Sequence, residues 1–458
     1  MHEWTRNGSK YLQGFCLLLI LVVGMAMRLG TAAHTQVDHP FRNDAREYVV
    51  YAWNTKYEGV YSQSMAAIGG QIGAVPAPDA IRPPGYPVFL LGWVDRDLTD
   101  AFITNVTRAQ AWIAGLTVLS VTLLAMALLG AWPGLAVGAM VALSPHQNIY
   151  VAYFLSETPF GAALMLALAS GAAALCARQK RWRLVWATVS GLFFGVSCLI
   201  RPTLNQWVLF VLIVVLLVPT ARRFWREAAV LALGFALMMS PWWVRNERVL
   251  HQMSSPEKML TTVQQGSYVD LMYKGRPETY GAPHRFDPGA ELANSSWSNL
   301  LADLRTKFND QPGAMLRWYL VSKVMYFFSW TSAEGWADFF TYPVLKSPWL
   351  IDPSYLRVTS IMLGLHVPMM LLGLLGTVLV FVPATRRLFG ASHADALRFL
   401  GLLHVFAIAV HVIGLPLARY SVPFQPLSFL LAVFSLVWMG RLYLEHRNRT
   451  MKVAPSHV

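Results

Sequence analysis

The chain has 458 residues, of which 55% are hydrophobic and only 13% are charged, and its mean hydropathy is +0.43. One soluble core cannot bury that much apolar surface, so the composition excludes an ordinary soluble protein and indicates an integral membrane protein. The formal net charge of +13 would suggest nucleic-acid binding in a soluble chain. In a membrane protein, however, basic residues gather in the cytoplasmic loops, so we expect no nucleic-acid partner.

Apolar windows of about 20 residues predict about ten membrane-spanning helices and therefore an all-α, polytopic fold. The first window precedes the small residues Gly30-Thr31-Ala32-Ala33 and so resembles a signal peptide. It is nevertheless long enough to cross a bilayer, and we interpret it as an uncleaved helix. The expected spans are residues 13–29, 108–129, 132–145, 149–177, 184–200, 204–219, 228–244, 358–382, 399–415 and 421–439.

The distribution of Lys and Arg predicts which connections face the cytoplasm. An even number of spans then places both termini inside. The segments dense in basic residues are 178–183, 221–227, 384–398 and the tail from Arg441.

Two long polar segments are consequently expected outside, residues 30–107 and 246–356. Residues 315–330 of the second are apolar enough to span the membrane, but a crossing there would invert the basic loop at Arg386. We therefore expect a helix lying in the membrane interface. The expected parts are an N-terminal transmembrane module (1–245) that contains the first outer loop, an extracytoplasmic loop with the interfacial helix (246–356), and a C-terminal transmembrane module (357–458).

Acidic residues of the first outer loop are the candidate catalytic groups. Asp44 and Glu47 open an expected helix over residues 45–57, and their spacing alone favours a capping box, in which Asp44 caps the helix and Glu47 occupies its third position. A carboxylate at the mouth of a membrane-embedded cavity is also suited to act as a general base. Both interpretations hold together if Glu47 caps and Asp44 is catalytic. Glu157, near the outer end of the fourth span, is a further candidate.

Arg82, Arg201, Arg245 and Arg419 all fall at the outer ends of spans or in the outer loop, against the positive-inside preference. Each of them could simply reach the headgroups or pair with an acid. The first three, however, stand beside proline or turn residues, which fix the backbone near a span end. Several guanidinium groups on one face are suited to clamp a phosphate.

The order of several short motifs resembles the GT-C membrane glycosyltransferases, in particular the bacterial branch related to protein O-mannosyltransferases and to the aminoarabinose transferase of lipid A. No single motif is specific, but their order over nearly the whole chain is. The motifs are Asp44-Ala-Arg-Glu-Tyr48, Ala52-Trp-Asn54, Gly59-Val-Tyr61-Ser, Arg82-Pro-Pro-Gly-Tyr-Pro87, Ser156-Glu157, Arg201-Pro202, Pro241-Trp-Trp-Val-Arg245-Asn246 and Arg419-Tyr420-x-x-Pro423.

This resemblance implies an inverting transferase that takes a sugar from a polyprenyl-phosphate carrier at the outer face of the membrane. It implies that Asp44 lies at the reaction centre and that Arg82 contacts the carrier phosphate. Arg201, Arg245 and Arg419 match the motifs as further phosphate ligands. Residues in the same motifs complete the candidate site: Tyr48, Tyr86, Glu157 and Tyr420.

The chain departs from the family pattern in one respect that concerns a metal. The second acid usually follows the first directly or nearly so, whereas Ala45 and Arg46 intervene here before Glu47. No metal site or other cofactor is assigned, and a divalent cation shared by the two acids is left open.

Other functions fit part of the pattern. A transporter or lipid flippase has many spans too, but the large outer loops and the concentration of charge at one face argue against it. An O-antigen ligase or polymerase shares the loop but uses a diphosphate carrier, and a non-catalytic scaffold needs no carboxylate. For a transferase, the expected setting is the bacterial inner membrane, with the site facing the periplasm. The expected partners are the lipid-linked donor and a glycan, lipid or protein acceptor. Residues 69–78 are expected to form a lid over the site.

Overall fold

The computed structural model describes residues 2–66, 68–69, 76–253, 257–331 and 335–453, so most of the segment expected to form a lid lies outside the described residues. In the described part, eight helices are long and apolar enough to cross a membrane, and two shorter apolar helices accompany them. Each of the ten expected spans corresponds to one of these helices. The prediction of an all-α, polytopic membrane protein is confirmed.

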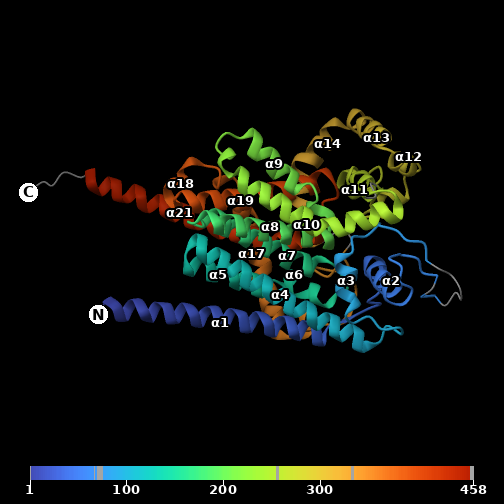
Figure 1. Ribbon diagram of the computed structural model, residues 1–458, viewed down its shortest axis with the longest axis horizontal. Coiled ribbons are helices and arrows are strands. Elements are labelled where there is room, and N and C mark those ends of the chain that lie inside the picture. The colour runs from blue at the N-terminus through green and yellow to red at the C-terminus, as the bar shows by residue number, and fades with distance from the viewer. Residues whose placement is uncertain (1, 67, 70–75, 254–256, 332–334, 454–458) are drawn as a thin grey trace, which may run out of the picture.

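The apolar helices form a bundle along the long axis of the molecule, and both termini lie at the same end (Figure 1). Within it, α8 packs against α7 and α10, α17 against α21, and α4 against α1 and α5. The helices are α1 (His2–His34), α4 (Asp100–Leu129), α5 (Ala131–Leu143), α7 (Glu157–Cys176), α8 (Lys180–Ile200), α9 (Trp207–Leu217), α10 (Trp225–Leu250), α17 (Pro353–Leu379), α19 (Ala391–Ile413) and α21 (Gln425–Val453).

The fourth span differs from the expected one, because residues 149–177 do not form a single helix. A short helix α6 (Pro145–Ile149) and a 3₁₀ turn η1 (Tyr150–Ala152) come first, and α7 begins only at Glu157. Residues 149–155 are apolar because they are buried inside the protein. Burial in protein and burial in lipid select the same side chains, so hydropathy alone places this boundary wrongly.

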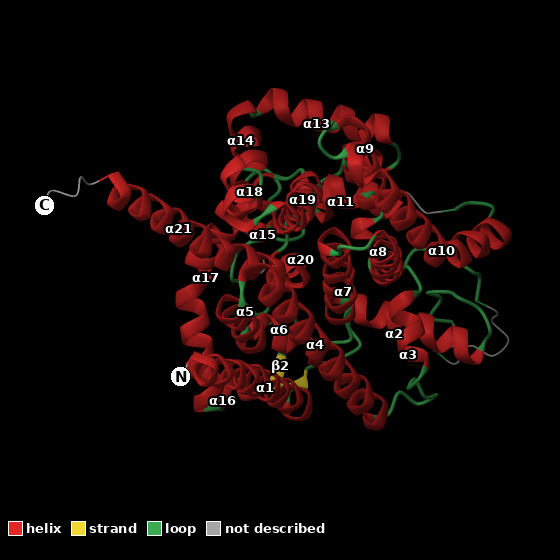
Figure 2. Cartoon of the chain, turned by 60° about the vertical axis from the view of Figure 1, so that its left-hand side comes forward, coloured by secondary structure: helices red, strands yellow, loops and turns green. Residues whose placement is uncertain are grey.

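Shorter elements cover the end of the bundle opposite the termini, where α2, α3 and α11 to α13 gather (Figure 1). In the turned view, α2 and α3 lie side by side beneath α10 (Figure 2). The first long polar segment, residues 30–107, contains α2 (Asn43–Tyr57) and α3 (Gly85–Leu91). The second, residues 246–356, contains α11 (Glu257–Gly266), η4 (Val269–Leu271), η5 (Pro277–Thr279), η6 (Pro283–Arg285), α12 (Ala290–Asn294), α13 (Trp297–Asp310), α14 (Pro312–Arg317), the π-helical turn η7 (Trp318–Ser322), α15 (Lys323–Phe327) and α16 (Pro348–Ile351).

Two short strands join these two segments. β1 (Gln36–Val37) pairs antiparallel with β2 (Val344–Lys346), so the start of the first segment is fastened to the end of the second. The remaining connections are η2 (Pro202–Leu204), η3 (Arg222–Phe224), α18 (Pro383–Phe389), α20 (Ala418–Ser421) and η8 (Val422–Phe424).

The expected helix over residues 315–330 is confirmed as a helical run from α14 through α15. One of its faces is exposed and apolar, with Leu320 72% and Met325 67% exposed, whereas Trp318 and Lys323 are buried. Lys323 donates hydrogen bonds from Nζ to the carbonyl oxygens of Val412 (2.7 Å) and Gly414 (2.9 Å) at the end of α19. Burial lowers the pKa of Lys323 to about 6. The position of this helix in the membrane interface stays a prediction.

A second buried cation is held in the same manner at the end of α5. Arg28 of α1 is fully buried and donates from Nη1 and Nη2 to the carbonyl oxygens of Ala142 (3.1 Å) and Val141 (3.0 Å). The last carbonyl groups of a helix have no partner within the helix and carry the negative end of its dipole, so a cation stabilises them. Arg28 and Lys323, the latter in its protonated form, are called the carbonyl-bound cations below.

Candidate functional site

Six charged side chains meet at the covered end of the bundle. They come from α2, from the turn before α3, from the facing ends of α7 and α8, and from α20, and they form a continuous set of ion pairs. We call them the arginine–carboxylate cluster, and its members are Asp44, Glu47, Arg82, Glu157, Arg201 and Arg419.

Asp44 lies inside the first turn of α2 and does not cap it. The helix begins at Asn43, and its N-cap residue is Arg42, whose side chain makes no capping hydrogen bond. The capping-box interpretation of Asp44 and Glu47 is therefore wrong. The Asp44 carboxylate instead joins two arginines: Oδ1 accepts from Arg82 Nη2 at 2.5 Å, and Oδ2 accepts from Arg419 Nη2.

Glu47 binds the same guanidinium group as Asp44. Its Oε2 accepts from Arg82 Nε at 2.6 Å, so two nitrogens of Arg82 are each engaged by a carboxylate. The Arg82 guanidinium also lies 5.2 Å from the centre of the Tyr48 ring. Both candidate catalytic acids are thus ion-paired with a residue expected to bind phosphate.

Glu157 and Arg201 form the deeper part of the cluster. Glu157 is the first residue of α7, where the helix dipole favours an acid, and its side chain is only 1% exposed. Oε1 lies 2.8 Å from Arg201 Nη1 and 3.8 Å from Arg419 Nε. Glu157 also borders a small pocket, lined in addition by Ala114, Thr117, Gln147, Tyr150, Thr158 and Val422.

The backbone explains why the turn that carries Arg82 lies beside the end of α8. Arg201 ends α8 in an extended conformation (φ −148°, ψ 124°) because Pro202 follows it. Gly85 begins α3 against this end, and a Cβ there would lie 2.7 Å from the carbonyl group of Leu199. The close approach needs glycine, and it holds the Arg82-Pro83-Pro84 turn beside the end of α8.

Arg245 is not brought into the cluster. It donates from Nη1 to the backbone oxygen of Asp79 (2.7 Å) and from Nη2 to that of Tyr61 (3.3 Å). Tyr61 in turn donates from its hydroxyl to the backbone oxygen of Arg82 (3.0 Å). Arg245 therefore fastens the loop that carries Arg82 to the end of α10.

Asp79 also holds the loop that carries Arg82 in place, and the sequence analysis did not single it out. Its carboxylate accepts from the backbone nitrogens of Gln63 (2.8 Å) and Ile81 (3.1 Å) and from the Tyr51 hydroxyl. The signal available in the sequence was an isolated acid three residues before Arg82.

The three candidate tyrosines occupy different positions. The Tyr48 hydroxyl donates to Ser156 Oγ at 3.2 Å, so it links α2 to the start of α7. Tyr86 is completely buried beneath it and donates to Gln110 Oε1 at 2.9 Å. The Tyr420 ring centre lies 4.5 Å from the guanidinium carbon of Arg201. Tyr48 and Tyr420 thus line the cluster, whereas Tyr86 supports it from the core.

Tyr342, from the second segment, also reaches the cluster and was not found in the sequence. Burial raises the pKa of its hydroxyl; Arg419 opposes this effect, and Asp44 adds to it. The side chain is 4% exposed. No motif surrounds it, because an aromatic residue in an apolar stretch looks like any packing residue.

The charges of the cluster balance, with three guanidinium groups facing three carboxylates. Burial alone would raise the pKa of Asp44, but the charges of Arg419 and Arg82 outweigh burial and hold this pKa well below its usual range. Within the described ranges, no group of three or more His, Cys, Asp and Glu side chains is arranged to hold a metal ion. In the cluster, the guanidinium groups of the three arginines are therefore paired with the protein's own carboxylates.

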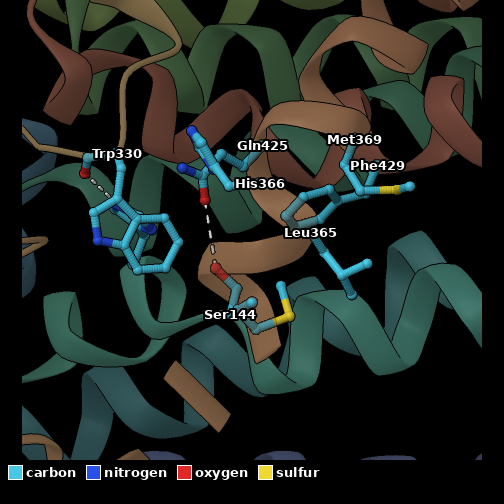
Figure 3. Close-up of a pocket in the computed structure, with 9 residues that line it drawn as sticks. Ser144, Trp330, Leu365, His366, Met369, Gln425 and Phe429 are labelled. Carbon is cyan, nitrogen blue, oxygen red and sulfur yellow. Dashed lines mark hydrogen bonds between the residues drawn. The ribbon is translucent and has the colours of Figure 1, made fainter. Parts of the chain in front are cut away.

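A separate small cavity lies between α6, α17 and α21 (Figure 3). His146 Nε2 forms a 2.8 Å hydrogen bond with the Trp330 carbonyl oxygen, and Ser144 donates to Gln425 across the cavity (Figure 3). Its lining residues are outside the arginine–carboxylate cluster: Ser144, His146, Trp330, Met362, Leu365, His366, Met369, Gln425 and Phe429.

No protein-family model and no curated protein matches the sequence. Solved structures do match. The oligosaccharyltransferase AglB of Archaeoglobus fulgidus, in complex with an inhibitory peptide and a dolichol-phosphate, aligns with a TM-score of 0.52 and 14% identity over 98% of this chain and 52% of AglB. ArnT of Cupriavidus metallidurans bound to undecaprenyl phosphate aligns with a TM-score of 0.41 and 15% identity over 95% of this chain and 78% of ArnT.

The chain spans about half the length of AglB. Identity at this level carries information about the fold and not about residue roles. The alignment with AglB shows that the described chain has the GT-C fold that its motifs led us to expect.

Proposed function

We propose that this protein is an inverting glycosyltransferase that moves a sugar from a polyprenyl-phosphate carrier to an acceptor at the outer face of the membrane. The observation that carries the proposal is the convergence of Arg82, Arg201 and Arg419 with Asp44 at one end of a bundle of apolar helices. Guanidinium groups bind phosphate oxygens bidentately, and a lipid-linked phosphate stands at the end of its apolar tail, where the bilayer meets water. The fold shared with AglB adds to this proposal.

In the proposed reaction, the acceptor oxygen or nitrogen attacks the anomeric carbon while the bond from that carbon to the phosphate oxygen breaks. The phosphate leaves with the bonding electrons, and the arginines stabilise the negative charge that develops on it. Asp44 takes the proton from the acceptor on the opposite face of the sugar. The configuration at the anomeric carbon is inverted, because one displacement occurs.

The remaining candidate residues take supporting roles. Arg245 positions the loop of Arg82 and makes no phosphate contact of its own, since its guanidinium is bound to that loop's backbone. Glu47 is ion-paired with Arg82, so we place it on the side of the site that binds the sugar donor. The setting we propose is the bacterial inner membrane, with this end of the bundle facing the periplasm and a glycan, lipid or protein as acceptor.

The test uses purified full-length protein with a panel of polyprenyl-phosphate sugars and, separately, polyprenyl-diphosphate sugars. Native membrane extract supplies the acceptor, and the labelled product is identified. Transfer from monophosphate donors only is the expected result. Transfer from diphosphate donors only would indicate a ligase or polymerase, and movement of lipid across vesicles without transfer would indicate a flippase.

A further inference from the structure

The carboxylates of the cluster compete with any phosphate for the same arginines. We propose, on the basis of the function proposed above, that the phosphate of the donor displaces Asp44 from Arg82 and Arg419, so that Asp44 is released to act as the base only when the donor is bound. The ion pairs described here are then the closed, donor-free state of the site, and the donor itself opens it.

The contacts of Arg82 show the competition most directly. Its Nε and Nη2 together form one of the two forks through which a guanidinium binds an oxyanion bidentately, and here they contact Glu47 at 2.6 Å and Asp44 at 2.5 Å. A phosphate that uses this fork must take the place of both carboxylates. Arg419 repeats the pattern, because its Nη2 is bound to the other oxygen of Asp44.

The charge balance points the same way. A phosphodiester carries one negative charge, and it would enter a cluster in which three acids already neutralise three arginines. At short distances and partial burial, the carboxylates already paired with these guanidinium groups repel an added phosphate strongly. The free energy of binding is therefore most favourable if an acid withdraws from the arginines as the phosphate arrives.

Exposure decides which acids withdraw. The side chains of Asp44 and Glu47 are 25% and 31% exposed, so each can turn toward water. Glu157 is 1% exposed and starts a membrane-spanning helix, so it has no such freedom. Glu157 and Arg201 form the fixed half of the cluster, and Asp44, Glu47, Arg82 and Arg419 form the exchangeable half.

This exchange solves a chemical difficulty of the donor-free geometry. A carboxylate held between two guanidinium groups is a poor proton acceptor, because they stabilise its ionised form. When the phosphate takes over those guanidinium groups, the same carboxylate regains its basicity beside the anomeric carbon. The protein thereby orders the reaction, with donor binding before activation of the acceptor.

The test measures the affinity of undecaprenyl phosphate, which lacks a sugar, for the full-length protein in nanodiscs. Asp44→Asn and Glu47→Gln each remove a competing anion, so each is expected to lower the Kd about tenfold. Glu58→Gln is the matched control, since it removes an exposed acid directly after α2 that lies outside the cluster, and it is expected to leave the Kd unchanged. Arg82→Ala is expected to raise the Kd.

The outcomes separate this inference from the proposed function. If the wild type binds and Arg82→Ala weakens binding, but Asp44→Asn and Glu47→Gln leave the Kd unchanged or raise it, the displacement is wrong and the phosphate site stands. If Asp44→Asn does not fold, Glu47→Gln alone decides. If the wild type does not bind the lipid phosphate, or Arg82→Ala binds as well as the wild type, the proposed function is wrong and the displacement with it.

Discussion

Buried cations are held in two ways in this protein. The carbonyl-bound cations, Arg28 and Lys323, donate to backbone oxygens at the ends of α5 and α19. In the arginine–carboxylate cluster, Arg82 and Arg419 donate to side-chain carboxylates that are themselves partly exposed. A backbone carbonyl at a helix end cannot leave its place without unwinding the helix, whereas a carboxylate can turn away by rotating its side chain.

The comparison suggests a rule for membrane proteins of this kind. Hydrogen bonds to backbone carbonyl groups make a basic side chain part of the structural framework, whereas an arginine bound by carboxylates is available to another anion. The two classes should therefore respond differently to mutation, the first through stability and the second through activity and donor binding. The predictions below test that separation, beginning with the largest expected effect.

Asp44→Asn should abolish most of the transfer activity while leaving the protein folded. Asn cannot accept the acceptor's proton, and loss of a general base costs about 10²–10⁴-fold in rate. Turnover with a polyprenyl-phosphate sugar and thermal unfolding in detergent are measured on the same preparation. Turnover close to that of the wild type would refute the role of Asp44 as a base.

Arg28→Met, unlike Asp44→Asn, should lower the stability of the protein. The protein that remains folded should bind the donor as the wild type does. The substitution leaves the carbonyl group of Val141 without this donor, whereas that of Ala142 keeps Asn148 as a donor, at a cost of about 1–3 kcal/mol. Thermal unfolding in detergent measures it, and Arg28→Lys is the control that keeps the charge. If Arg28→Met is as stable as the wild type, carbonyl-bound cations are not structural and the comparison fails.

Arg245→Ala should lower kcat/KM about tenfold, because it releases the loop that positions Arg82 and a small misplacement of a binding group is costly. The effect should lie mainly in KM for the donor, since Arg245 holds backbone at Tyr61 and Asp79. Arg248→Ala, an exposed arginine on the same helix, is the matched control. A fall in kcat alone would instead place Arg245 at the reacting phosphate.

Lys323 makes stability depend on pH, and this is the smallest effect. Its pKa is lowered to about 6 in the folded protein and is about 10.4 in an unfolded chain. Between these values the unfolded state binds more protons, so the free energy of unfolding rises with pH. Lys323→Met removes this dependence, and the difference in Tm between variant and wild type should grow from pH 9 to pH 6 in favour of the variant. A pH-independent difference would mean that Lys323 stays charged throughout.

Much of the fold followed from hydropathy, because lipid-facing helices need long apolar segments. The arginines could be singled out since they oppose the positive-inside preference, and the structure brings Arg82, Arg201 and Arg419 together. Their partners could not be identified, because Asp44 lies 38 residues from Arg82 and 375 from Arg419 along the chain. Local spacing suggested a helix cap for Asp44, but contacts across the fold outweigh it.

The deeper residues were beyond sequence reasoning for a different reason. Tyr342 looks like a packing residue, and Glu157 was placed near the outer end of a span without its cavity or its ion pair with Arg201. The segment before Glu157 was assigned to the membrane because its side chains are as apolar as those that face lipid. Hydropathy indicates that a side chain is shielded from water, but it does not indicate whether lipid or protein surrounds that side chain.

The proline that ends α8 has one more consequence. Helices α7 and α8 contain 20 and 21 residues, so each is about 30 Å long, which is the thickness of the hydrocarbon core. Glu157 and Arg201 stand at the far ends of this hairpin, one bilayer away from the basic turn that joins the two helices. The length of these two helices therefore sets the distance between the basic turn and the pair Glu157–Arg201, and with it the depth of the proposed phosphate site.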